Sequence, residues 1–306
     1  MRQVSELEVG GERLQVSNLD KVLYPKAGFT KAQVIDYYAK ISPALLPHLK
    51  NHPLTLKRYP EGVEGPFFYE KQCPSYRPKW MKTAPVESTK DQRTINYCMA
   101  NDLRSLVWAA NLADLELHTS LALYPKILSP TSIVFDLDPG LPANIVQCAQ
   151  VALWLKAKLE TMKLACFAKT SGSKGLQVYI PLNTPTSYDI TKPFAQNMAA
   201  FLEKEHPELI VSKMAKNLRG GKVFVDWSQN DQHKTTVCVY SLRAKEQPTV
   251  STPMTWAEVE MVLKKKDARL ASFTSDQVLE RVKETGDLFE PVRTLKQRVK
   301  SSVIAP

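Results

Sequence analysis

Ser132–Gly140, with the sequence SIVFDLDPG, is the stretch that decides the fold. The apolar run Ile133–Phe135 predicts a buried β-strand. Side chains two positions apart on a strand point to the same face, so the carboxylates of Asp136 and Asp138 converge. The Pro-Gly pair that follows ends the strand and places the two acids at its end, near solvent. Two such like charges are stable at neutral pH only when they share a proton or a cation.

The pair has two interpretations on these residues alone. Aspartate is common in turns because its side chain bonds nearby backbone groups, so both carboxylates could simply be solvated. A bound metal ion is the alternative, and a third acid in a similar setting favours it. Asp226 is such an acid, because it follows the apolar run Val223–Val225 in GKVFVDWSQN. Three oxygen ligands suit Mg²⁺ or Mn²⁺, which take further ligands from phosphate.

The histidines and cysteines do not indicate a zinc site. The five histidines show no pairing of zinc type, and the five cysteines contain no C-x-x-C. An odd number of scattered cysteines is typical of a cytosolic protein with reduced thiols. We therefore expect free thiols at all five positions: Cys73, Cys98, Cys148, Cys166 and Cys238.

Composition narrows the class of partner. The formal net charge is +10, which favours a polyanionic partner, although moderately basic proteins are common. A hydrophobic content of 43% is enough for a substantial core. The chain has no run of 18 or more apolar residues and no apolar core of a signal peptide near its start. We therefore expect a cytoplasmic protein with no membrane partner.

Mixed elements follow along the chain without strict alternation of strand and helix, which favours an α+β fold over a doubly wound sheet. Thr30 is the predicted N-cap of the first helix, which Pro43 and Pro47 should break. Periodicity predicts helices over 30–41, 101–115, 142–162 and 191–206, and strands over 115–121, 132–139, 165–169, 176–182, 209–212, 222–227 and 235–242.

No long Gly/Ser linker, repeat or low-complexity tract divides the chain, so we expect one domain over residues 1–306. From about Phe289 the sequence loses periodicity and gains charge. Residues 291–306 are therefore expected to form a flexible tail or a frayed end.

The loop in KTSGSKGLQVYIPL lies between two predicted strands. Ser171–Gly175 combines two glycines, two hydroxyls and a lysine, which a backbone cradle for phosphate oxygens requires. Alone, such a turn is more often an ordinary hairpin. Together with the three acids, it predicts that a triphosphate and two divalent ions share one cleft.

These motifs resemble the polymerase domain of bacterial ligase D, a member of the archaeo-eukaryotic primase superfamily that acts in non-homologous end joining. The segments that carry the resemblance are FDLDPG, TSGSKGLQVY, KVFVDWSQN and KTTVCVYSLRA, with VSNLDKVLYPKAGFTK and LKRYPEGV nearer the start. The resemblance covers roughly residues 10 to 290. It implies mixed and antiparallel sheets with packed helices around a primase-polymerase, RRM-like core.

The resemblance also implies roles for single residues. Asp136 and Asp138 would bridge two ions, Mn²⁺ or Mg²⁺, and Asp226 would hold the ion that activates the primer 3′-hydroxyl. The implied nucleotide-binding residues are Lys57, His118, Ser171, Lys174, Gln177, Arg219, Gln229 and Arg243. An ordinary half-buried histidine and a surface arginine are the alternatives for His118 and Arg243.

The DNA-binding residues implied by the resemblance lie in the N-terminal third. Asn18, Lys21 and Lys31 match a pocket for a 5′-phosphate, and Phe67 and Phe68 would stack on template bases. Since adjacent phenylalanines are more often core residues, one of the two could be buried instead. Residues 1–100 or so would thus bind DNA ends, and residues 101–290 would form the catalytic core.

The implied function is a DNA-directed nucleotidyltransferase that repairs gaps or double-strand breaks, recognises a 5′-phosphate and prefers NTP to dNTP. Ku and a DNA ligase are the implied partners. Two alternatives from other classes remain: a metal-dependent phosphoesterase, which needs no triphosphate loop, and a non-catalytic DNA-end binder, which needs no group of three acids.

Gln177 departs from the usual family motif, SGxxGxH, which has histidine at that position. By strand alternation the side chain should face the cleft, where glutamine offers only neutral donors to a triphosphate. We therefore expect weaker nucleotide binding than with histidine. Gln177→His should lower the KM for NTP and add a pH dependence between about pH 6 and 7.

Overall fold

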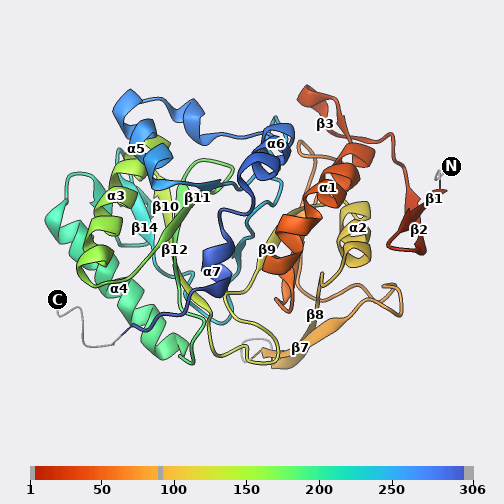
Figure 1. The fold of residues 1–306 in the computed structure, drawn as a ribbon, viewed down its shortest axis with the longest axis horizontal. Coiled ribbons are helices and arrows are strands. Elements are labelled where there is room, and N and C mark those ends of the chain that lie inside the picture. Colours follow the sequence, from red (N-terminus) through yellow and green to blue (C-terminus); the bar gives the residue numbers. More distant parts are fainter. Residues whose placement is uncertain (1–3, 89–91, 300–306) are drawn as a thin grey trace. The chain divides into compact units, whose positions relative to one another are not determined.

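A computed structural model gives the fold, and it describes residues 4–88 and 92–299 (Figure 1). The chain forms two compact units, each assembled from separate segments. Unit 1 comprises Met1–Ser120, Thr235–Ser251 and Thr274–Gly286, and unit 2 comprises Leu121–Lys234, Thr252–Phe273 and Asp287–Pro306. The boundary expected near residue 100 therefore falls inside unit 1.

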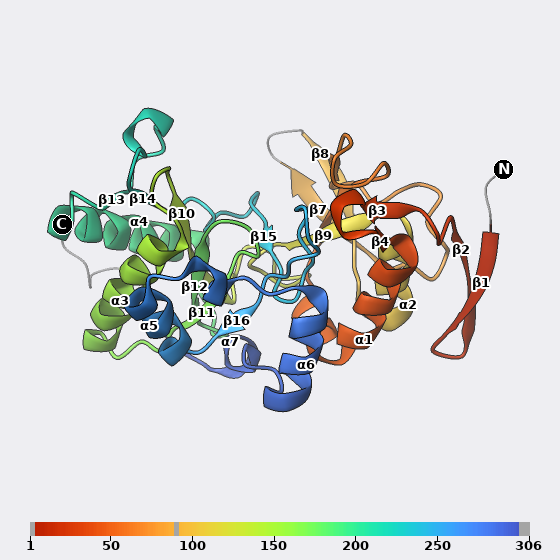
Figure 2. The same ribbon diagram turned by 90° about the horizontal axis from the view of Figure 1, so that it is seen from above.

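Unit 1 contains a sheet with the strand order β15-β9-β5-β8-β7, in which β6 also pairs with β5 and all pairings are antiparallel. Helices α1 and α2 pack against each other in this unit (Figure 2). The elements of unit 1 are β1 (Val4–Val9), β2 (Glu12–Ser17), β3 (Val22–Tyr24), η1 (Pro25–Ala27), β4 (Phe29–Thr30), α1 (Lys31–Leu49), β5 (Leu54–Arg58), β6 (Phe68–Glu70), β7 (Thr83–Ser88), β8 (Arg93–Cys98), α2 (Leu103–Asn111), β9 (Asp114–Thr119), β15 (Thr236–Val237) and α6 (Ser275–Thr285).

Helix α1 begins where the sequence predicts and ends later. Thr30 accepts a hydrogen bond from the backbone of Gln33, whose side chain in turn accepts one from the backbone of Thr30. The prediction that Pro43 breaks the helix is wrong, and so is the same prediction for Pro47. A proline at position 43 removes the donor to the carbonyl of Ala39, and the hydroxyl of Ser42 bonds that carbonyl instead, at 2.8 Å. The helix continues because its buried face continues to Leu49.

Unit 2 contains a sheet with the order β13-β14-β10-β12-β11-β16, antiparallel except between β13 and β14. Ile133, Phe135 and Leu137 of β10 belong to its buried core with residues of α3, α4 and α5. The alternate residues of β10 therefore face away from these helices. The elements are β10 (Ser132–Pro139), α3 (Ile145–Thr161), β11 (Phe167–Thr170), β12 (Leu176–Pro181), α4 (Tyr188–Glu205), β13 (Ile210–Val211), η2 (Lys216–Leu218), β14 (Val223–Asp226), β16 (Pro253–Met254), α5 (Trp256–Lys265), η3 (Ala268–Ala271) and α7 (Glu290–Thr294).

The two sheets with their helices confirm the predicted α+β class with mixed and antiparallel pairing. Each predicted helix and strand has a counterpart, but some bounds differ, and the strand predicted over 235–242 is reduced to Thr236–Val237. The second helix ends at Asn111, and α3 starts after its N-cap Asn144, so Pro142 lies outside the helix. Among the helices of the described residues, none has the length and apolar character that crossing a membrane requires.

The expectation of five free thiols is wrong for two of them. Cys73 and Cys98 form a disulfide, with their Cα atoms 4.9 Å apart. The backbone of Cys73 bonds the carbonyl of Asn96 at 2.7 Å, which brings the segment after β6 to the end of β8. This pairing is a tertiary contact that cysteine spacing does not reveal. The other three, Cys148, Cys166 and Cys238, are buried free thiols.

The start of the expected tail packs onto unit 2 instead of forming a tether. Phe289 is buried against Tyr179, and α7 follows it directly. The side chain of Gln297 bonds the backbone of Ala165 and Pro181. Single hydrogen bonds of this kind produce no periodic pattern in the sequence, so the segment was expected to be a tail. Residues 300–306 of the expected tail lie outside the described residues.

Candidate active site

A row of polar side chains crosses the sheet of unit 2 on the face away from helices α3, α4 and α5. Asp136 of β10 lies opposite Asp226 of β14 on one side and opposite Gln177 of β12 on the other. Gln177 in turn lies opposite Lys169 of β11. Directly opposite residues of antiparallel strands share a face, so these four side chains are neighbours in one line. Asp138 lies on the same face of β10, and it is exposed where Asp136 is half-buried.

The carboxylates of this row differ in their hydrogen bonds. Oδ1 of Asp226 accepts from the backbone and the hydroxyl of Ser228, at 2.9 and 2.6 Å. Its Oδ2 accepts from the amide of Gln229 at 2.8 Å. Oδ1 of Asp136, in contrast, is buried and has no hydrogen-bond partner. Asp226 is therefore fixed by its own loop, and Asp136 holds an oxygen that lacks a partner.

The environment raises the pKa of Asp136 to about 7. Burial is the largest cause, and repulsion by the charges of Asp138 and Asp226 adds to it. A hydrogen bond from Gln177 and the charge of Lys169 act in the opposite direction. At neutral pH the row thus takes up a proton readily, and a cation would relieve the same repulsion.

The donor set fits a hard divalent cation. It consists of carboxylate oxygens only, and the unpartnered Oδ1 of Asp136 is an acceptor without a protein donor. Within residues 4–88 and 92–299, no group of three or more His, Cys, Asp or Glu side chains is already gathered closely enough to hold a metal ion. Assignment of metal ions to these three acids is therefore a proposal.

The predicted phosphate loop joins β11 to β12 beside the acids. The hydroxyl of Ser171 accepts from the backbone of Ser173 and Gly175, both at 3.2 Å, so the loop is closed on itself. Gly172 has a φ of 68°, which favours glycine. A Cβ at Gly175 would lie 2.0 Å from the carbonyl oxygen of Leu137, the residue between Asp136 and Asp138. Both glycines of the motif thus have a backbone reason, and the second brings the loop against β10.

The remaining predicted residues of unit 2 differ in their contacts with the three aspartates. Lys174 is exposed at the tip of the loop, and Gln229 bonds Asp226 directly. Arg219 holds its guanidinium 3.7 Å from the ring centre of Phe224, the residue opposite Asp138, and donates to the carbonyl of Met214 at 2.8 Å. Gln177 accepts a hydrogen bond from Lys169 at 2.6 Å and lies directly opposite Asp136, so its neighbours are side chains of the row.

Three predicted nucleotide-binding residues lie together in unit 1, around a carboxylate that sequence reasoning missed. Glu116 is 2% exposed, accepts from Lys57 at 3.1 Å and from His118 at 3.0 Å, and forms an ion pair with Nε of Arg243 at 3.3 Å. The hydroxyl of Tyr59 also donates to it, at 3.3 Å. One buried anion thus fixes three basic side chains, and we call this set the Glu116 cluster.

The charges of the Glu116 cluster follow from burial and pairing. Burial alone would raise the pKa of Glu116, but the hydrogen bond from His118 and the charges of Arg243 and Lys57 lower it below its ordinary value. Burial lowers the pKa of His118, which the nearby cations reinforce and Glu116 opposes. His118 is therefore neutral at pH 7, with the proton on Nε2, because a carboxylate can only accept.

The paired phenylalanines are both exposed, so the alternative that one of them is a core residue is wrong. Phe67 is 51% exposed and Phe68 is 44% exposed. Phe67 stacks on Tyr59 at a centroid distance of 5.2 Å, and the ammonium of Lys57 lies 4.6 Å from its ring centre. Phe68 lies beside Arg58, whose guanidinium is 5.1 Å from the ring centre. Exposed aromatic rings next to cations suit stacking on bases.

The predicted 5′-phosphate residues gather at the turn after β2. Asn18 has a φ of 54°, and its carbonyl accepts from the backbone of Lys21 at 3.1 Å. The backbone of Lys31 bonds the carbonyl of Lys21 at 2.8 Å, which ties the turn to the start of α1. Lys31 is buried with its ammonium 2.6 Å from the carbonyl of Ser17, and Lys21 pairs with Glu61 at 2.8 Å.

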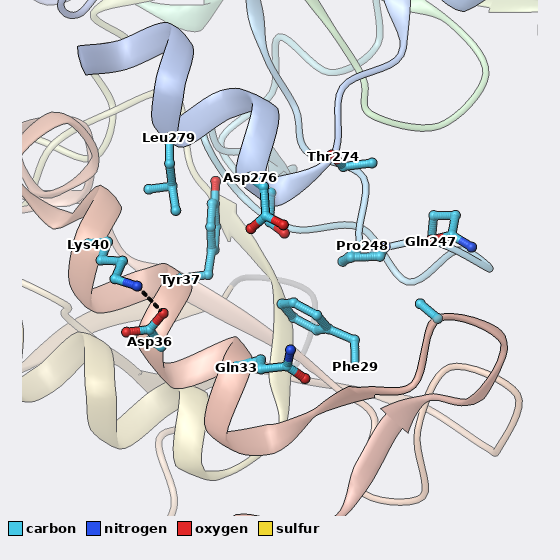
Figure 3. Close-up of a pocket in the computed structure, with 12 residues that line it drawn as sticks. Phe29, Gln33, Asp36, Tyr37, Lys40, Gln247, Pro248, Thr274, Asp276 and Leu279 are labelled. Atoms are coloured by element: carbon cyan, nitrogen blue, oxygen red, sulfur yellow. Dashed lines mark hydrogen bonds and ion pairs between the residues drawn. The ribbon is translucent and has the colours of Figure 1, made fainter.

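A cavity of about 320 Å³ lies in unit 1, and no predicted site residue is among those that line it (Figure 3). Its walls come from α1, from the start of α6 and from the loop before Pro248. Asp36 and Lys40 on its wall pair with each other at 2.6 Å (Figure 3). Its lining mixes Phe29 and Leu279 with polar groups and indicates no ligand class.

Of two residues that the sequence analysis did not select, Glu116 had a detectable signal in the sequence and Lys169 had none. Glu116 stands two positions before His118 on a predicted strand, so alternation alone places both on one face. Lys169 is six positions before Gly175 in the motif, but its pairing with Gln177 depends on the register of β11 and β12. That register cannot be deduced from a hairpin loop of unknown geometry.

Comparisons with known proteins agree on one family. The family model described as "LigD, primase-polymerase domain" matches residues 30–289. The chain is 41% identical over 283 residues to the multifunctional non-homologous end joining protein LigD of Mycolicibacterium smegmatis, which covers 92% of this chain. It is 34% identical over 278 residues to the bifunctional non-homologous end joining protein LigD of Bacillus subtilis, which covers 90% of this chain.

A solved structure is similar over nearly its whole length. The polymerase domain from Mycobacterium tuberculosis ligase D, in complex with DNA, superposes with a TM-score of 0.85 at 40% identity. The match covers 93% of this chain and 99% of that one. The chain spans only 36% of the length of the Mycolicibacterium smegmatis relative and 44% of that from Bacillus subtilis.

Proposed function

This chain belongs to the family of LigD primase-polymerase domains, and from that premise we propose that it adds nucleotides to primer 3′ ends at gaps or double-strand breaks in DNA. The observation that carries the proposal is the row of Asp226, Asp136 and Asp138 with the Ser171–Gly175 loop packed against it. Nucleotidyl transfer requires acidic side chains that hold divalent cations, and it requires a loop that binds phosphate oxygens.

Asp136, Asp138 and Asp226 would hold two divalent ions, Mn²⁺ or Mg²⁺. Such ions stabilise the charge on the attacking and leaving oxygens of an in-line displacement. The protein contributes the fixed orientation of Asp226, through Ser228 and Gln229, and the partnerless oxygen of Asp136. Both features favour binding of a cation over a solvated turn.

In each unit, the residues proposed for nucleotide binding supply donors that phosphate oxygens can accept. In unit 2, Ser171 and Lys174 supply a hydroxyl and an exposed ammonium, and Arg219 supplies a guanidinium. In unit 1, the Glu116 cluster presents Lys57 and Arg243 in fixed positions. His118, neutral at pH 7, donates its Nε2 proton to Glu116, so its Nδ1 would only accept a hydrogen bond and would not add a charge.

The DNA-binding part of the proposal rests on unit 1. Lys21 and Lys31 lie with Asn18 at one turn, where two ammonium groups suit a terminal phosphate dianion. Phe67 and Phe68 would stack on template bases because both rings are exposed. The similar polymerase domain of Mycobacterium tuberculosis was solved in complex with DNA, which supports a DNA substrate.

We extend the proposal to the partners and the setting of the reaction. The relatives are non-homologous end joining proteins, so Ku and a DNA ligase are the proposed partners, the cytoplasm is the proposed location, and NTP is the proposed preferred substrate over dNTP.

Primer extension on a gapped duplex with Mn²⁺ tests the proposal in one assay. We expect extension that depends on a nucleotide triphosphate, that is faster with NTP than with dNTP, and that is stronger with a 5′-phosphate than with a 5′-hydroxyl at the gap. Release of phosphate or nucleotides without triphosphate would favour the phosphoesterase. Tight binding of the gap with neither reaction would favour a non-catalytic end binder.

A further inference from the structure

Lys169 is a buried cation at the end of the row that contains Asp226, Asp136 and Gln177. Its residue is 1% exposed, and Nζ lies 2.6 Å from Oε1 of Gln177. Its ammonium also lies 5.6 Å from the ring centre of Tyr179. Burial of a lysine is unfavourable unless its charge is compensated and its donors are bonded. A position with this requirement, beside the site, suggests a task beyond packing.

The contact with Lys169 determines how the amide of Gln177 is turned. A lysine ammonium has donors only, so the amide must direct its oxygen toward Lys169. The hydroxyl of Tyr179 donates to the same oxygen over a longer distance of 3.4 Å. The amide nitrogen is therefore left for the opposite neighbour in the row, which is the carboxylate of Asp136.

We propose that Lys169 is a positioning residue for Asp136, acting through Gln177, so that the carboxylate is held in one orientation for a divalent cation. Without Lys169, the amide of Gln177 is free to flip and to present its oxygen to an anion. The inference rests on the proposed function, because it assigns metal binding to Asp136. It also gives Gln177 a role toward the acid instead of toward a triphosphate.

The alternative is that Lys169 acts only through its charge. A positive charge near the row repels a divalent cation, so its removal would then strengthen metal binding. A positioning residue has the opposite effect, since loss of a group that orients a metal ligand typically weakens metal binding by about 10–100-fold. The sign of the change in Mn²⁺ affinity separates the two.

The test is titration of the full chain with Mn²⁺ alone, without DNA or nucleotide, by electron paramagnetic resonance of free Mn²⁺. Lys169→Met should weaken Mn²⁺ binding by about tenfold, and Lys169→Arg, which keeps the charge and the donors, should restore most of it. Lys204→Met removes the same charge from an exposed site on α4 and should leave the affinity unchanged. In a Gln177→Leu background, Lys169→Met should have little further effect.

A second measurement keeps the proposal testable if Lys169→Met lowers stability. In ¹⁵N–¹H spectra, the side-chain amide signal of Gln177, identified by its loss in Gln177→Leu, should shift and broaden in Lys169→Met and be retained in Lys169→Arg. In primer extension, Lys169→Met should lower kcat at saturating NTP with KM nearly unchanged. A raised KM with an unchanged kcat would mean that Gln177 serves the nucleotide and would overturn the proposal.

The outcomes distinguish this inference from the proposed function. Asp138→Ala, run in parallel, should lose Mn²⁺ binding. If wild type binds Mn²⁺ no better than Asp138→Ala, the metal assignment itself fails. If wild type and Lys169→Met bind equally, or Lys169→Met binds more tightly, only the positioning role is overturned.

Discussion

Asp136 lies directly opposite Asp226 in the antiparallel pairing of β10 and β14. The two carboxylates share one face, and Asp138 of the same strand adds a third charge to it. Burial, together with repulsion by these two neighbours, raises the pKa of Asp136 to about 7 in the absence of a cation. Because this repulsion destabilises the folded state at neutral pH, removal of a charge from the row should raise the free energy of unfolding.

Asp136→Asn should stabilise the metal-free protein at high pH. The folded pKa of Asp136, about 7, lies above the ordinary value of 3.8, so the folded state keeps a proton that the unfolded chain has lost. Stability therefore falls as pH rises between about 4 and 7. Asparagine cannot ionise, so the gain in unfolding free energy should be about 1–3 kcal/mol larger at pH 8 than at pH 5.

Urea denaturation in EDTA at both pH values measures this difference. A gain that is equal at pH 5 and pH 8 would mean that Asp136 is not ionised against its neighbours, and the repulsion would then be absent. Added Mn²⁺ should stabilise the wild type more than Asp136→Asn, since a ligand that binds only the folded state adds to its stability.

Glu116→Gln should destabilise the protein at pH 7 by about 2–4 kcal/mol, because it removes a buried anion from three basic partners. The folded pKa of Glu116 is below its ordinary value of 4.5, so its contribution is complete above that value. The contribution is lost as pH falls toward the folded pKa. The difference between wild type and variant should therefore shrink below about pH 4.5.

Glu280→Gln is the matched control for this prediction. Glu280 is an exposed partner of Lys283 in the same unit, and its loss should change the unfolding free energy by less than about 0.5 kcal/mol. Equal effects of the two variants would show that the Glu116 cluster contributes no more than a surface ion pair.

The geometry of the candidate motif was predictable from sequence because it depends on local rules. Strand alternation placed Asp136 and Asp138 on one face, and the glycine pattern of Ser171–Gly175 indicated the loop. The pairing of Gln177 with Lys169 was not predictable, since it depends on the register between two strands. The family resemblance placed Gln177 toward a triphosphate, whereas the structure gives it Asp136 as a neighbour.

Gly175→Ala should impair the loop and the site together. Its Cβ would lie 2.0 Å from the carbonyl oxygen of Leu137, so the loop or β10 must move. We expect a loss of about 1–3 kcal/mol in unfolding free energy and slower nucleotide addition. Gly220→Ala is the control for stability, because a Cβ there meets nothing within 4 Å. If both alanine variants unfold at the same urea concentration, the loop does not press on β10.

The larger errors in the sequence-based expectations concern contacts between distant residues. The helix was expected to end at the first proline, but Ser42 replaces the missing donor and the buried face continues. Cys73 and Cys98 were expected to be free thiols. They pair because the segment after β6 lies beside the end of β8, where the backbone of Cys73 bonds Asn96. Neither the hydrogen bond from the Ser42 hydroxyl nor the contact between the two cysteines follows from a periodic pattern in the sequence.

Lys21→Ala should weaken binding to a gap with a 5′-phosphate by about tenfold or more, because a charged hydrogen bond contributes about 1.5–3 kcal/mol. Binding to a gap with a 5′-hydroxyl should change much less. Lys50→Ala removes an exposed charge elsewhere in unit 1 and should affect both substrates equally and weakly. Fluorescence anisotropy at fixed salt measures the six affinities of wild type and the two variants for both gaps. An equal loss on both gaps for Lys21→Ala would indicate general attraction to the DNA backbone.

Single-turnover addition of one nucleotide to a gapped duplex, with Mn²⁺ and saturating enzyme, tests the central claim most directly when wild type is compared with Asp138→Ala. The account predicts that wild type extends the primer and that Asp138→Ala binds the same duplex with unchanged affinity but loses at least about a thousandfold in rate, which corresponds to about 4 kcal/mol in the barrier. Extension by Asp138→Ala at a rate close to that of wild type would contradict the assignment of this acid row as the catalytic centre.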